Sequence, residues 1–443
     1  MKIIVIDDDP TGSQSVHDCL LLLNWNYETL LKGLLSNSSL LFILANTRSL
    51  SEKEVKKRLR EICNNLYKIS VENNLQDNLL FVSRGDSTLR GHNFLEPDLI
   101  NKYLGPFDAT FHIPAFLEGN RITVNGKHFV NGIPAHKTPF AKDNIFGYET
   151  NDLKQLLHKK SKSKIQLKNI ENLNDIEQSS LSELRKFMEN LKNNTHVIVD
   201  IDKFSQLEKF SEMVRELIKN KKFLFRTAAS FLKAISNTKN NKKNNFYYSQ
   251  LRLRNELNKF LPGLIIIGSY TEISTIQLKK LLELDVFETV ELDVQKFYNI
   301  NLLKDKETQI FKLKKIILDA IRKALKNSLT PVIFTSRKEK VLENNLEQID
   351  FYNSLSFFIA EIVEDIKYEI GYLISKGGIT SNTILNSSFN VDYVYLEGQI
   401  SRGISLVTAK LKNTNNDLPV ITFPGNLGND YSLKEVWEAI ENK

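Results

Sequence analysis

Short apolar runs alternate with longer amphipathic stretches along most of the chain. The short runs are rich in Ile, Val, Leu and Phe, which is typical of strands in a buried sheet. The expected strands cover residues 2–6, 40–45, 78–83, 109–113, 196–200 and 222–225 in the first half, and 263–268, 289–292, 331–335, 371–375, 393–396 and 419–423 in the second. Strands that alternate with helices favour parallel sheets covered by helices, so the pattern predicts an α/β fold.

Polar segments and helix start signals indicate how these elements are grouped. Ser51 followed by Glu54, and Ser180 followed by Glu183, predict capping boxes at two helix N-termini. The alternation breaks at residues 236–245 (SNTKNNKKNN), which lack apolar side chains and predict a linker.

We therefore expect two domains, residues 1–235 and 263–443, each with a mostly parallel sheet. Residues 236–262 would be a linker and connecting segment, with a helix at 247–260. A second polar stretch, 159–178, predicts an insertion or a crossover within the first domain.

Composition narrows the class of protein. The 443 residues include 60 Lys and Arg against 53 Asp and Glu, a net charge of +7, but these cations lie scattered among asparagines. A nucleic-acid interface would cluster cations with aromatic side chains, so we expect no nucleic-acid partner. The longest apolar stretches are too short or too interrupted for a membrane span of ~20 residues. Cys19 and Cys63 are the only cysteines, which excludes a disulfide scaffold and predicts a cytoplasmic protein.

Charged residues gather where the expected strands end, which is where ligands bind in open α/β sheets. The first strand runs into Asp7-Asp8-Asp9, followed by a Pro-Thr-Gly turn. Adjacent carboxylates repel one another unless they are solvated, metal-bound or paired with cations, so we favour a functional role over a solvated loop.

A second polar cluster follows the third expected strand. Residues 83–92 (SRGDSTLRGH) contain two arginines, one aspartate, three hydroxyl groups and two glycines. The guanidinium fork of arginine matches the geometry of carboxylate or phosphate. A helix cap with exposed arginines is the simpler alternative. Further along, residues 112–130 are rich in turn residues and predict a loop with a hairpin, in which Glu118 and Arg121 are secondary candidates.

Three glycine-containing turns follow expected strands of the second half. They are Gly268-Ser269, Lys376-Gly377-Gly378 and Pro424-Gly425-Asn426-Leu427-Gly428. Glycines at strand–helix turns let backbone amides approach phosphate oxygens, although each turn alone is a weak signal. Walker A and G-x-G-x-x-G sequences are absent, so P-loop and Rossmann dinucleotide sites are excluded.

Two alternative functions use the same residues. Asp7-Asp8-Asp9-Pro10-Thr11 fits the D-x-D-x-T pattern of haloacid-dehalogenase-type phosphatases, with Asp7 as the nucleophile and Asp9 as the acid/base. The late acidic motif of such enzymes has its nearest match in Asp200 and Asp202. A non-catalytic sensor that binds a sugar acid is the other alternative.

The motifs together resemble the four-carbon acid sugar kinase family over nearly the whole chain. Those that carry the resemblance are residues 8–12, 84–92, 113–116, 268–269, 335–337, 377–380 and 424–428, which occur in the family's order. The resemblance implies an N-terminal domain that binds the sugar acid and a C-terminal domain that binds ATP, with the active site in the cleft between them. The chain departs from the family pattern at Ile379, where many members have an acidic residue, at residues 424–428, and at Leu117, where a proline is frequent.

The residues and the resemblance together give one expected mechanism. A sugar acid offers a carboxylate, which Arg84 and Arg90 would clamp, and hydroxyl groups, which would bond to other polar residues of the first domain. The complete set of expected substrate residues is Asp8, Thr11, Gly12, Arg84, Ser87, Thr88, Arg90 and His92. Asp86 is the expected catalytic base, with Asp9 second.

The expected ATP-binding residues are Ser269, Gly377, Gly378, Ile379, Thr380, Gly425, Asn426 and Gly428. Phosphoryl transfer also predicts Mg²⁺, whose ligands the sequence does not identify. The expected partners are a small sugar acid and ATP, and a homodimer is compatible with these features.

Overall fold

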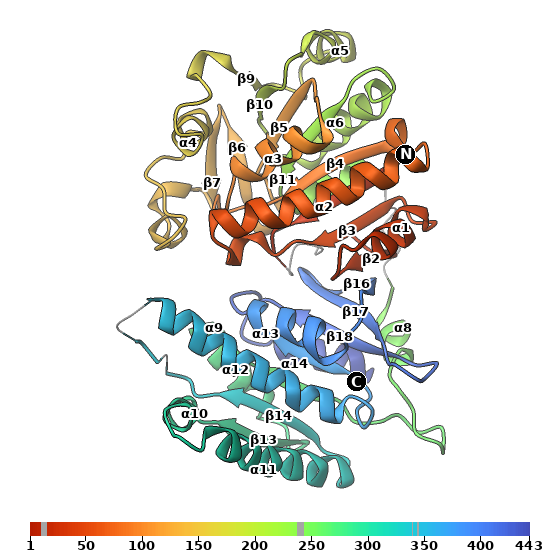
Figure 1. Ribbon diagram of the computed structural model, residues 1–443, viewed down its shortest axis with the longest axis vertical. Coiled ribbons are helices and arrows are strands. Elements are labelled where there is room, and N and C mark those ends of the chain that lie inside the picture. The colour runs from red at the N-terminus through yellow and green to blue at the C-terminus, as the bar shows by residue number, and fades with distance from the viewer. Residues whose placement is uncertain (10–15, 237–242, 339, 343–344) are drawn as a thin grey trace. The chain divides into compact units, whose positions relative to one another are not determined.

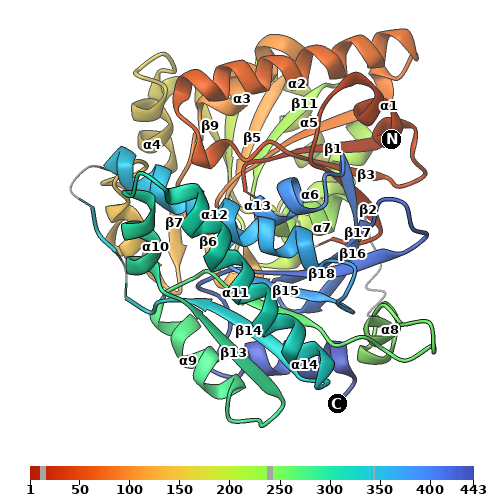
Figure 2. The same cartoon turned by 60° about the horizontal axis from the view of Figure 1, so that its bottom comes forward.

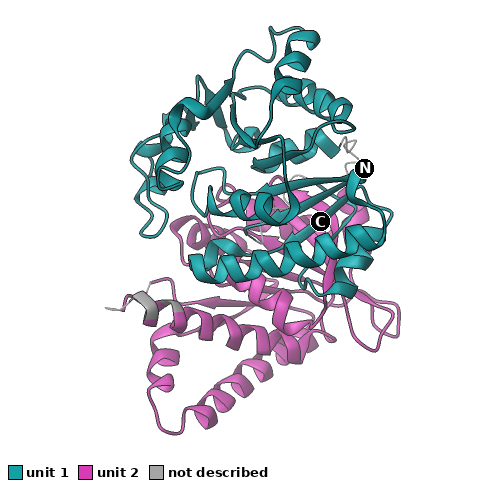
Figure 3. Cartoon of the chain, turned by 45° about the horizontal axis from the view of Figure 1, so that its top comes forward, with its two compact units in different colours: residues 1–241 teal, residues 242–443 magenta. Residues whose placement is uncertain are grey.

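The computed structural model describes residues 1–443 except 10–15, 237–242, 339 and 343–344, and it divides into two compact units (Figure 3). The first unit comprises residues 1–241 and the second comprises residues 242–443. Each unit contains its own sheet and helices, in agreement with the predicted α/β class.

The sheet of the first unit is parallel throughout, in the order β2-β3-β1-β4-β11-β5-β10-β9. Its strands are β1 (Lys2–Asp7), β2 (Cys19–Leu22), β3 (Leu40–Leu44), β4 (Leu79–Arg84), β5 (Ala109–Ile113), β9 (Ile170–Leu173), β10 (Thr195–Val199) and β11 (Phe223–Thr227). All five residues of β3 are buried, as expected for a strand covered on both faces. A small antiparallel sheet, β6 (Arg121–Val124), β7 (Lys127–Val130) and β8 (Ile133–Pro134), confirms the predicted hairpin.

Helices cover both faces of this sheet. They are α1 (Tyr27–Leu35), α2 (Glu52–Glu72), α3 (Leu95–Leu104), α4 (Leu153–Lys160), α5 (Leu181–Asn190), α6 (Phe204–Leu217) and α7 (Ala229–Ser236). Successive side chains of a strand point to opposite faces, and on β11 Arg226 contacts α3 whereas Phe225 packs on Phe210 of α6 and Phe231 of α7. Accordingly, α3 and its neighbour α2 lie on one face, and α6 and α7 on the other (Figure 2). Both predicted capping boxes are present, at the starts of α2 and α5.

The sheet of the second unit is mixed, in the order β13-β14-β12-β15-β18-β17-β16. Figure 1 labels β13 and β14 at one end of this order and β18, β17 and β16 at the other. Its strands are β12 (Leu264–Ile267), β13 (Phe287–Leu292), β14 (Thr330–Thr335), β15 (Leu373–Lys376), β16 (Tyr393–Ser401), β17 (Ile404–Lys410) and β18 (Asp417–Phe423). The pairs from β13 to β18 are parallel, whereas β17 runs antiparallel to β18 and β16.

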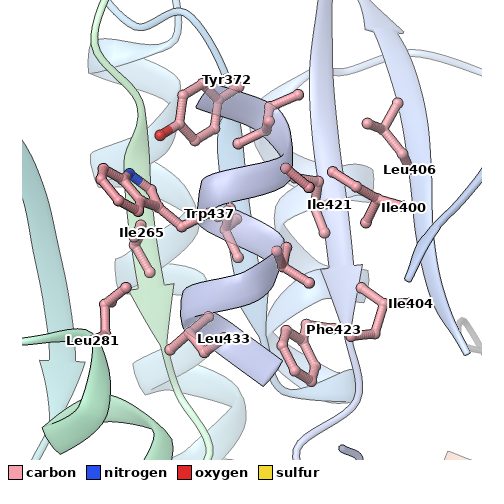
Figure 4. Packing of buried hydrophobic residues seen from close by; sticks show 14 of the residues in the cluster. Ile265, Leu281, Tyr372, Ile400, Ile404, Leu406, Ile421, Phe423, Leu433 and Trp437 are labelled. Atoms are coloured by element: carbon pink, nitrogen blue, oxygen red, sulfur yellow. The ribbon is translucent and has the colours of Figure 1, made fainter. Parts of the chain in front are cut away.

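The helices of the second unit complete its core. They are α8 (Asn245–Gln250), α9 (Glu272–Leu281), α10 (Val294–Asn301), α11 (Lys306–Lys326), α12 (Asn345–Ile366), α13 (Gly378–Thr383) and α14 (Ser432–Glu441). α14 lies against the sheet with Leu433 and Trp437 facing Ile265, Ile421 and Phe423 (Figure 4). This packing fixes the ends of the strands that hold the glycine turns. None of the helices in the described ranges is long and apolar enough to cross a membrane.

The predicted helix at residues 247–260 is wrong beyond its first turn. α8 ends at Gln250, and the amide of Leu253 then donates to the carbonyl oxygen of Gly371 at 2.9 Å instead of to a helical neighbour. Arg254 stacks on the ring of Phe260, with 3.6 Å between the guanidinium carbon and the ring centroid. Contacts to a distant part of the chain therefore replace the helical ladder.

Candidate functional site

The carboxyl ends of neighbouring parallel strands bring the two polar clusters together in the first unit. The register pairs Asp7 of β1 with Arg84 of β4, and Arg84 with Thr227 of β11. Just beyond the strands, the amide of Asp8 donates to the carbonyl oxygen of Arg84 at 3.2 Å. The acidic triplet and residues 83–92 therefore share one edge of the sheet, as the sequence predicted.

Asp8 is the centre of an ion-pair network at this edge. Its side chain is 0% exposed and accepts hydrogen bonds from Arg48 at 2.8 Å and from Arg84 at 3.2 Å. Arg48, which follows β3, also contacts Asp9 at 3.0 Å. Pairing with arginines thus removes the repulsion expected between neighbouring carboxylates.

Asp7 contacts the same network through Arg84 and is also buried. Its carboxylate contacts Arg84 at 3.3 Å and accepts the amide of Asp9 at 3.3 Å. Burial raises the pKa of Asp7 to about 7, although the charge of Arg84 opposes the shift. A buried carboxyl engaged in this way is poorly placed to attack a phosphate ester, which weakens the phosphatase hypothesis.

A second buried ion pair, between Arg226 and Glu96, packs next to the Asp8 network. Arg226 of β11 donates to Glu96 of α3 at 2.7 Å and to Ser83 at 2.8 Å, and it lies 3.8 Å from Asp8. Glu96 is 0% exposed, and burial raises its pKa. A side chain at Gly85 would overlap the guanidinium of Arg226, so this close packing requires glycine.

Arg48, Glu96 and Arg226 were not among the predicted site residues. A signal existed for Arg48, which follows the second expected strand within the run Asn46-Thr47-Arg48. Arg226 lies inside a strand and Glu96 inside a helix, so inspecting only the residues after strand ends could not have found them.

The 83–92 segment folds around Asp86. The carboxylate of Asp86 accepts a hydrogen bond from Arg90 at 2.7 Å and another from the hydroxyl of Thr88. Burial would raise the pKa of Asp86, but the charges of Arg48 and Arg90 and the Thr88 hydrogen bond hold it well below its usual range. Asp86 is therefore an ionised carboxylate at the edge where the acids and arginines meet.

The remaining predicted substrate residues occupy different positions. Ser87 accepts a hydrogen bond from Arg121, which begins β6. A ring nitrogen of His92 contacts the carbonyl oxygen of Leu50 at 3.0 Å, and its ring packs edge-on against Phe146. Thr11 and Gly12 lie outside the described residues. Glu118, a secondary candidate, instead accepts a hydrogen bond from the hydroxyl of Ser230.

A cavity of about 40 Å³ opens beside Asp86. Its polar wall includes Asn93, His112 and Arg226, and its apolar wall is formed mainly by leucines of α4. Burial lowers the pKa of His112 well below its usual value. Nε2 of His112 lies 2.9 Å from Nδ1 of His196. The cavity leaves room next to the charged network for part of a small polar molecule.

The acids of this edge do not form a metal centre. In the described part of the chain, no group of three or more His, Cys, Asp or Glu side chains could hold an ion. The carboxylates at this edge point to arginines instead. Asp200, the nearest match to a late phosphatase motif, accepts the amide of Gly126 at 2.9 Å. These donors do not fit a protein-bound Mg²⁺.

The second unit contains a pocket of about 430 Å³ at the ends of β12, β14, β15 and β18. The residues that line it are Gly268, Ser269, Tyr270, Thr271, Thr335, Gln348, Tyr352, Asn353, Leu355, Ser356, Ile359, Gly377, Gly378, Ile379, Thr380 and Gly425. Six predicted nucleotide residues are in this set. Two are not: Asn426 is exposed, and Gly428 lies against Ser432 at the start of α14.

The pocket floor has open space for phosphate oxygens at Gly378, whereas the amide of Gly377 is already engaged within the protein. Gly377 has a φ of 134°, which side-chain-bearing residues rarely adopt, and its amide donates to the carbonyl oxygen of Phe423 at 2.9 Å. No atom lies within 4 Å of the position that a Cβ of Gly378 would occupy. The rings of Tyr270 and Tyr352, 5.8 Å apart, offer an aromatic wall, and Ile379, 59% exposed, lies at the pocket without a charge. These features fit a nucleotide.

The side chains of Arg337 and Lys376 donate hydrogen bonds to backbone carbonyl oxygens in the loops around this pocket. Arg337, two residues after the end of β14, donates to the carbonyl oxygen of Ser269 at 2.7 Å. Lys376 is 0% exposed, and its ammonium donates to the carbonyl oxygen of Pro424 at 3.1 Å. Burial lowers the pKa of Lys376 to about 7.

Comparison with family models agrees with this division of roles. A model described as a sugar-binding N-terminal domain matches residues 3–235, and one described as a nucleotide-binding C-terminal domain matches residues 264–433. The first model alone spans more than half of the chain.

Individual relatives are more distant. A D-erythronate kinase of Heliobacterium modesticaldum is 30% identical over 150 residues, which are 32% of this chain and 32% of the relative. Two solved structures share the fold across nearly the whole chain. A protein proposed as a tRNA synthase from Salmonella typhimurium LT2 has a TM-score of 0.71 at 14% identity, with 98% of each chain covered. A DUF1537 protein of Haemophilus influenzae has a TM-score of 0.65 at 18% identity, with 99% of this chain and 100% of that chain covered.

Proposed function

Because this chain belongs to the four-carbon acid sugar kinase family, we propose that it transfers the γ-phosphoryl group of ATP to a hydroxyl group of a small sugar acid. The observation that carries the proposal is the edge of the first sheet, where carboxylates, guanidiniums and hydroxyls lie within hydrogen-bonding distance of one another. A sugar acid presents the complementary groups, several hydroxyls and one carboxylate.

Asp86 is the proposed base for the attacking hydroxyl, with Asp9 as the alternative. The low pKa of Asp86 makes it a weak proton acceptor, but it keeps the carboxylate ionised and able to orient a hydroxyl group. Phosphoryl transfer depends more on positioning and charge neutralisation than on base strength, because its transition state is loose. Asp7 has the higher pKa but is only 1% exposed. Thr88, whose hydroxyl donates to Asp86, is the other proposed partner of substrate hydroxyls. Asp8, which the sequence also predicts for this role, is 0% exposed and acts through the arginines that it pairs with.

The proposed ATP site is the pocket of the second unit. Its glycine-lined floor, at Gly377 and Gly378, would take the phosphates, and Tyr270 and Tyr352 would face the base. ATP supplies the phosphoryl group when bound, and transfer requires its γ-phosphate to reach the acceptor hydroxyl. Since the described acids do not form a metal site, Mg²⁺ would depend mainly on phosphate oxygens and water as ligands.

One experiment tests the proposal against both alternatives. The protein is incubated with ATP, Mg²⁺ and a panel of four-carbon and related sugar acids, and ADP and phosphorylated product are measured. We expect ADP release that depends on one or a few acids. Thermal stabilisation by an acid without ADP release would indicate the sensor, and hydrolysis of phosphate esters that is lost in Asp7→Asn would indicate the phosphatase.

Asp86→Asn tests the proposed base. It removes the carboxylate while keeping its shape, so we expect at least a 100-fold loss of kcat, on the order of the effect of general-base catalysis, with unchanged ATP affinity. Asp77→Asn is the control, since Asp77 is an exposed aspartate of the same unit. Full activity of Asp86→Asn would remove Asp86 from the role.

A further inference from the structure

The guanidiniums near the proposed acceptor site differ in whether a carboxylate already neutralises them. Each of four arginines has a carboxylate partner in the first unit. They are Arg48 with Asp8 and Asp9, Arg84 with Asp7 and Asp8, Arg90 with Asp86, and Arg226 with Glu96. Arg121 is the exception, because no carboxylate of the described residues lies within 4.0 Å of its guanidinium.

Arg121 is held at the same edge by its backbone and by aromatic rings. Its amide and its carbonyl oxygen both pair with Phe116, at 3.0 and 2.9 Å, which closes a tight loop before β6. The guanidinium carbon lies 5.6 Å from the ring centroid of Phe116 and 5.8 Å from that of Phe140. Such rings contact the face of a guanidinium and leave its edge open for hydrogen bonds in the plane.

The edge of the Arg121 guanidinium has unused donors. One terminal nitrogen donates to the hydroxyl of Ser87, while Nε is buried and has no hydrogen-bond partner. Burial lowers the pKa of Arg121, and so does repulsion by Arg90, Arg84 and Arg48, against the attraction of Asp86. A cation in this position gains more from an incoming anion than one that is already paired.

We infer that Arg121, together with the hydroxyl of Ser87, anchors the carboxylate of the acceptor. Arg84 and Arg90, which the sequence predicts as the carboxylate clamp, are positioning residues that hold Asp8 and Asp86. This inference rests on the proposed kinase function and deepens it. It requires an acceptor with a carboxylate, and a neutral polyol of the same length would be a poor substrate.

The test compares a sugar acid with its own carboxamide, which keeps the hydroxyls and removes the charge. The wild type, Arg121→Gln and Arg121→Lys are assayed for kcat and KM with both acceptors. For the acid, we expect Arg121→Gln to lower kcat/KM on the order of 100-fold, mainly through KM, since hydrogen bonds between charged groups are strong. Arg121→Lys should retain only part of the wild-type kcat/KM for the acid, because lysine lacks the planar guanidinium fork.

For the carboxamide, the wild type and Arg121→Gln should have similar kcat/KM. Equal losses on both acceptors through kcat would place Arg121 on the transferring phosphoryl group and overturn the inference. An unchanged kcat/KM for the acid would also overturn it. Arg185→Gln, which alters an exposed arginine on α5, is the matched control.

Binding in the absence of ATP separates this inference from the proposed function. The acid should raise the thermal unfolding temperature of the wild type but not that of Arg121→Gln, and ATP should stabilise both, which shows that the variant is folded. If the acid binds the wild type through Arg121 without turnover, the kinase proposal fails and the anchor stands. If the wild type neither turns over nor binds any acid, both fail.

Discussion

Replacing Lys376 by methionine should change how the stability of the second unit depends on pH. Lys376 is fully buried at the end of β15, beside the proposed phosphate-binding turn, and burial lowers the pKa of its ammonium from 10.5 to about 7. Between these values the unfolded chain holds a proton that the folded chain has released. The free energy of unfolding therefore rises with pH across this window.

The size of the effect follows from the shift. One pKa unit corresponds to about 1.4 kcal/mol, so burial of Lys376 costs about 4 kcal/mol at pH 7 and about 2 kcal/mol at pH 9. Methionine removes this penalty but loses the hydrogen bond to Pro424, which contributes about 1 kcal/mol. Lys376→Met should therefore be more stable than the wild type at pH 7, by a margin about 2 kcal/mol larger than at pH 9.

Urea unfolding at pH 7, 8 and 9 measures this margin. The chain has two tryptophans, and in a Trp25→Phe background the fluorescence of Trp437 reports the core of the second unit. Lys326→Met, which alters an exposed lysine of α11, controls for loss of positive charge. A margin that does not change with pH would refute the argument, because it would mean that Lys376 keeps its proton when folded.

Two further substitutions test the packing around the sites. Gly378→Val should weaken ATP binding at least 10-fold, measured by calorimetry, with little change in stability, because the new side chain would fill only the open space proposed for the phosphates. An unchanged ATP affinity would mean that ATP binds elsewhere. Gly85→Ala should lower the free energy of unfolding of the first unit, measured in urea, by about 3 kcal/mol, because the new methyl group pushes Arg226 away from the buried Glu96. A loss below about 1 kcal/mol would show that the ion pair tolerates the shift.

The strands were predictable because buried parallel strands are uninterrupted apolar runs. Every expected strand overlaps an observed one, and residues 109–113 match β5 completely. The strands that were missed are short or lie outside the parallel core. β9 is the four residues Ile-Glu-Asn-Leu within a polar stretch, and β17 pairs antiparallel in the mixed part of the second sheet. Short and half-polar segments become strands through their neighbours, which local sequence does not contain.

The site was predictable only in outline. The rule that parallel strands end at one edge correctly brought the acidic triplet next to residues 83–92. Which charged residues pair could not be predicted from the sequence. Arg226 on a strand and Glu96 on a helix are 130 positions apart, and only the fold brings them into contact. In the second unit, residues from the three glycine turns line one pocket, whereas Gly428 packs against Ser432, and the binding of a nucleotide there stays a prediction.

Charge pairing decides which arginines can serve a ligand. A buried guanidinium that already contacts a buried carboxylate can bind an external anion only by releasing that partner, and breaking such a pair costs about 3–5 kcal/mol. Arg84 and Arg226, paired with Asp8 and Glu96, are under this constraint. For Arg121 an incoming carboxylate displaces no internal acid. Sequence composition counts all of these arginines equally, whereas the fold pairs Arg48, Arg84, Arg90 and Arg226 with internal carboxylates and leaves Arg121 without one among the described residues.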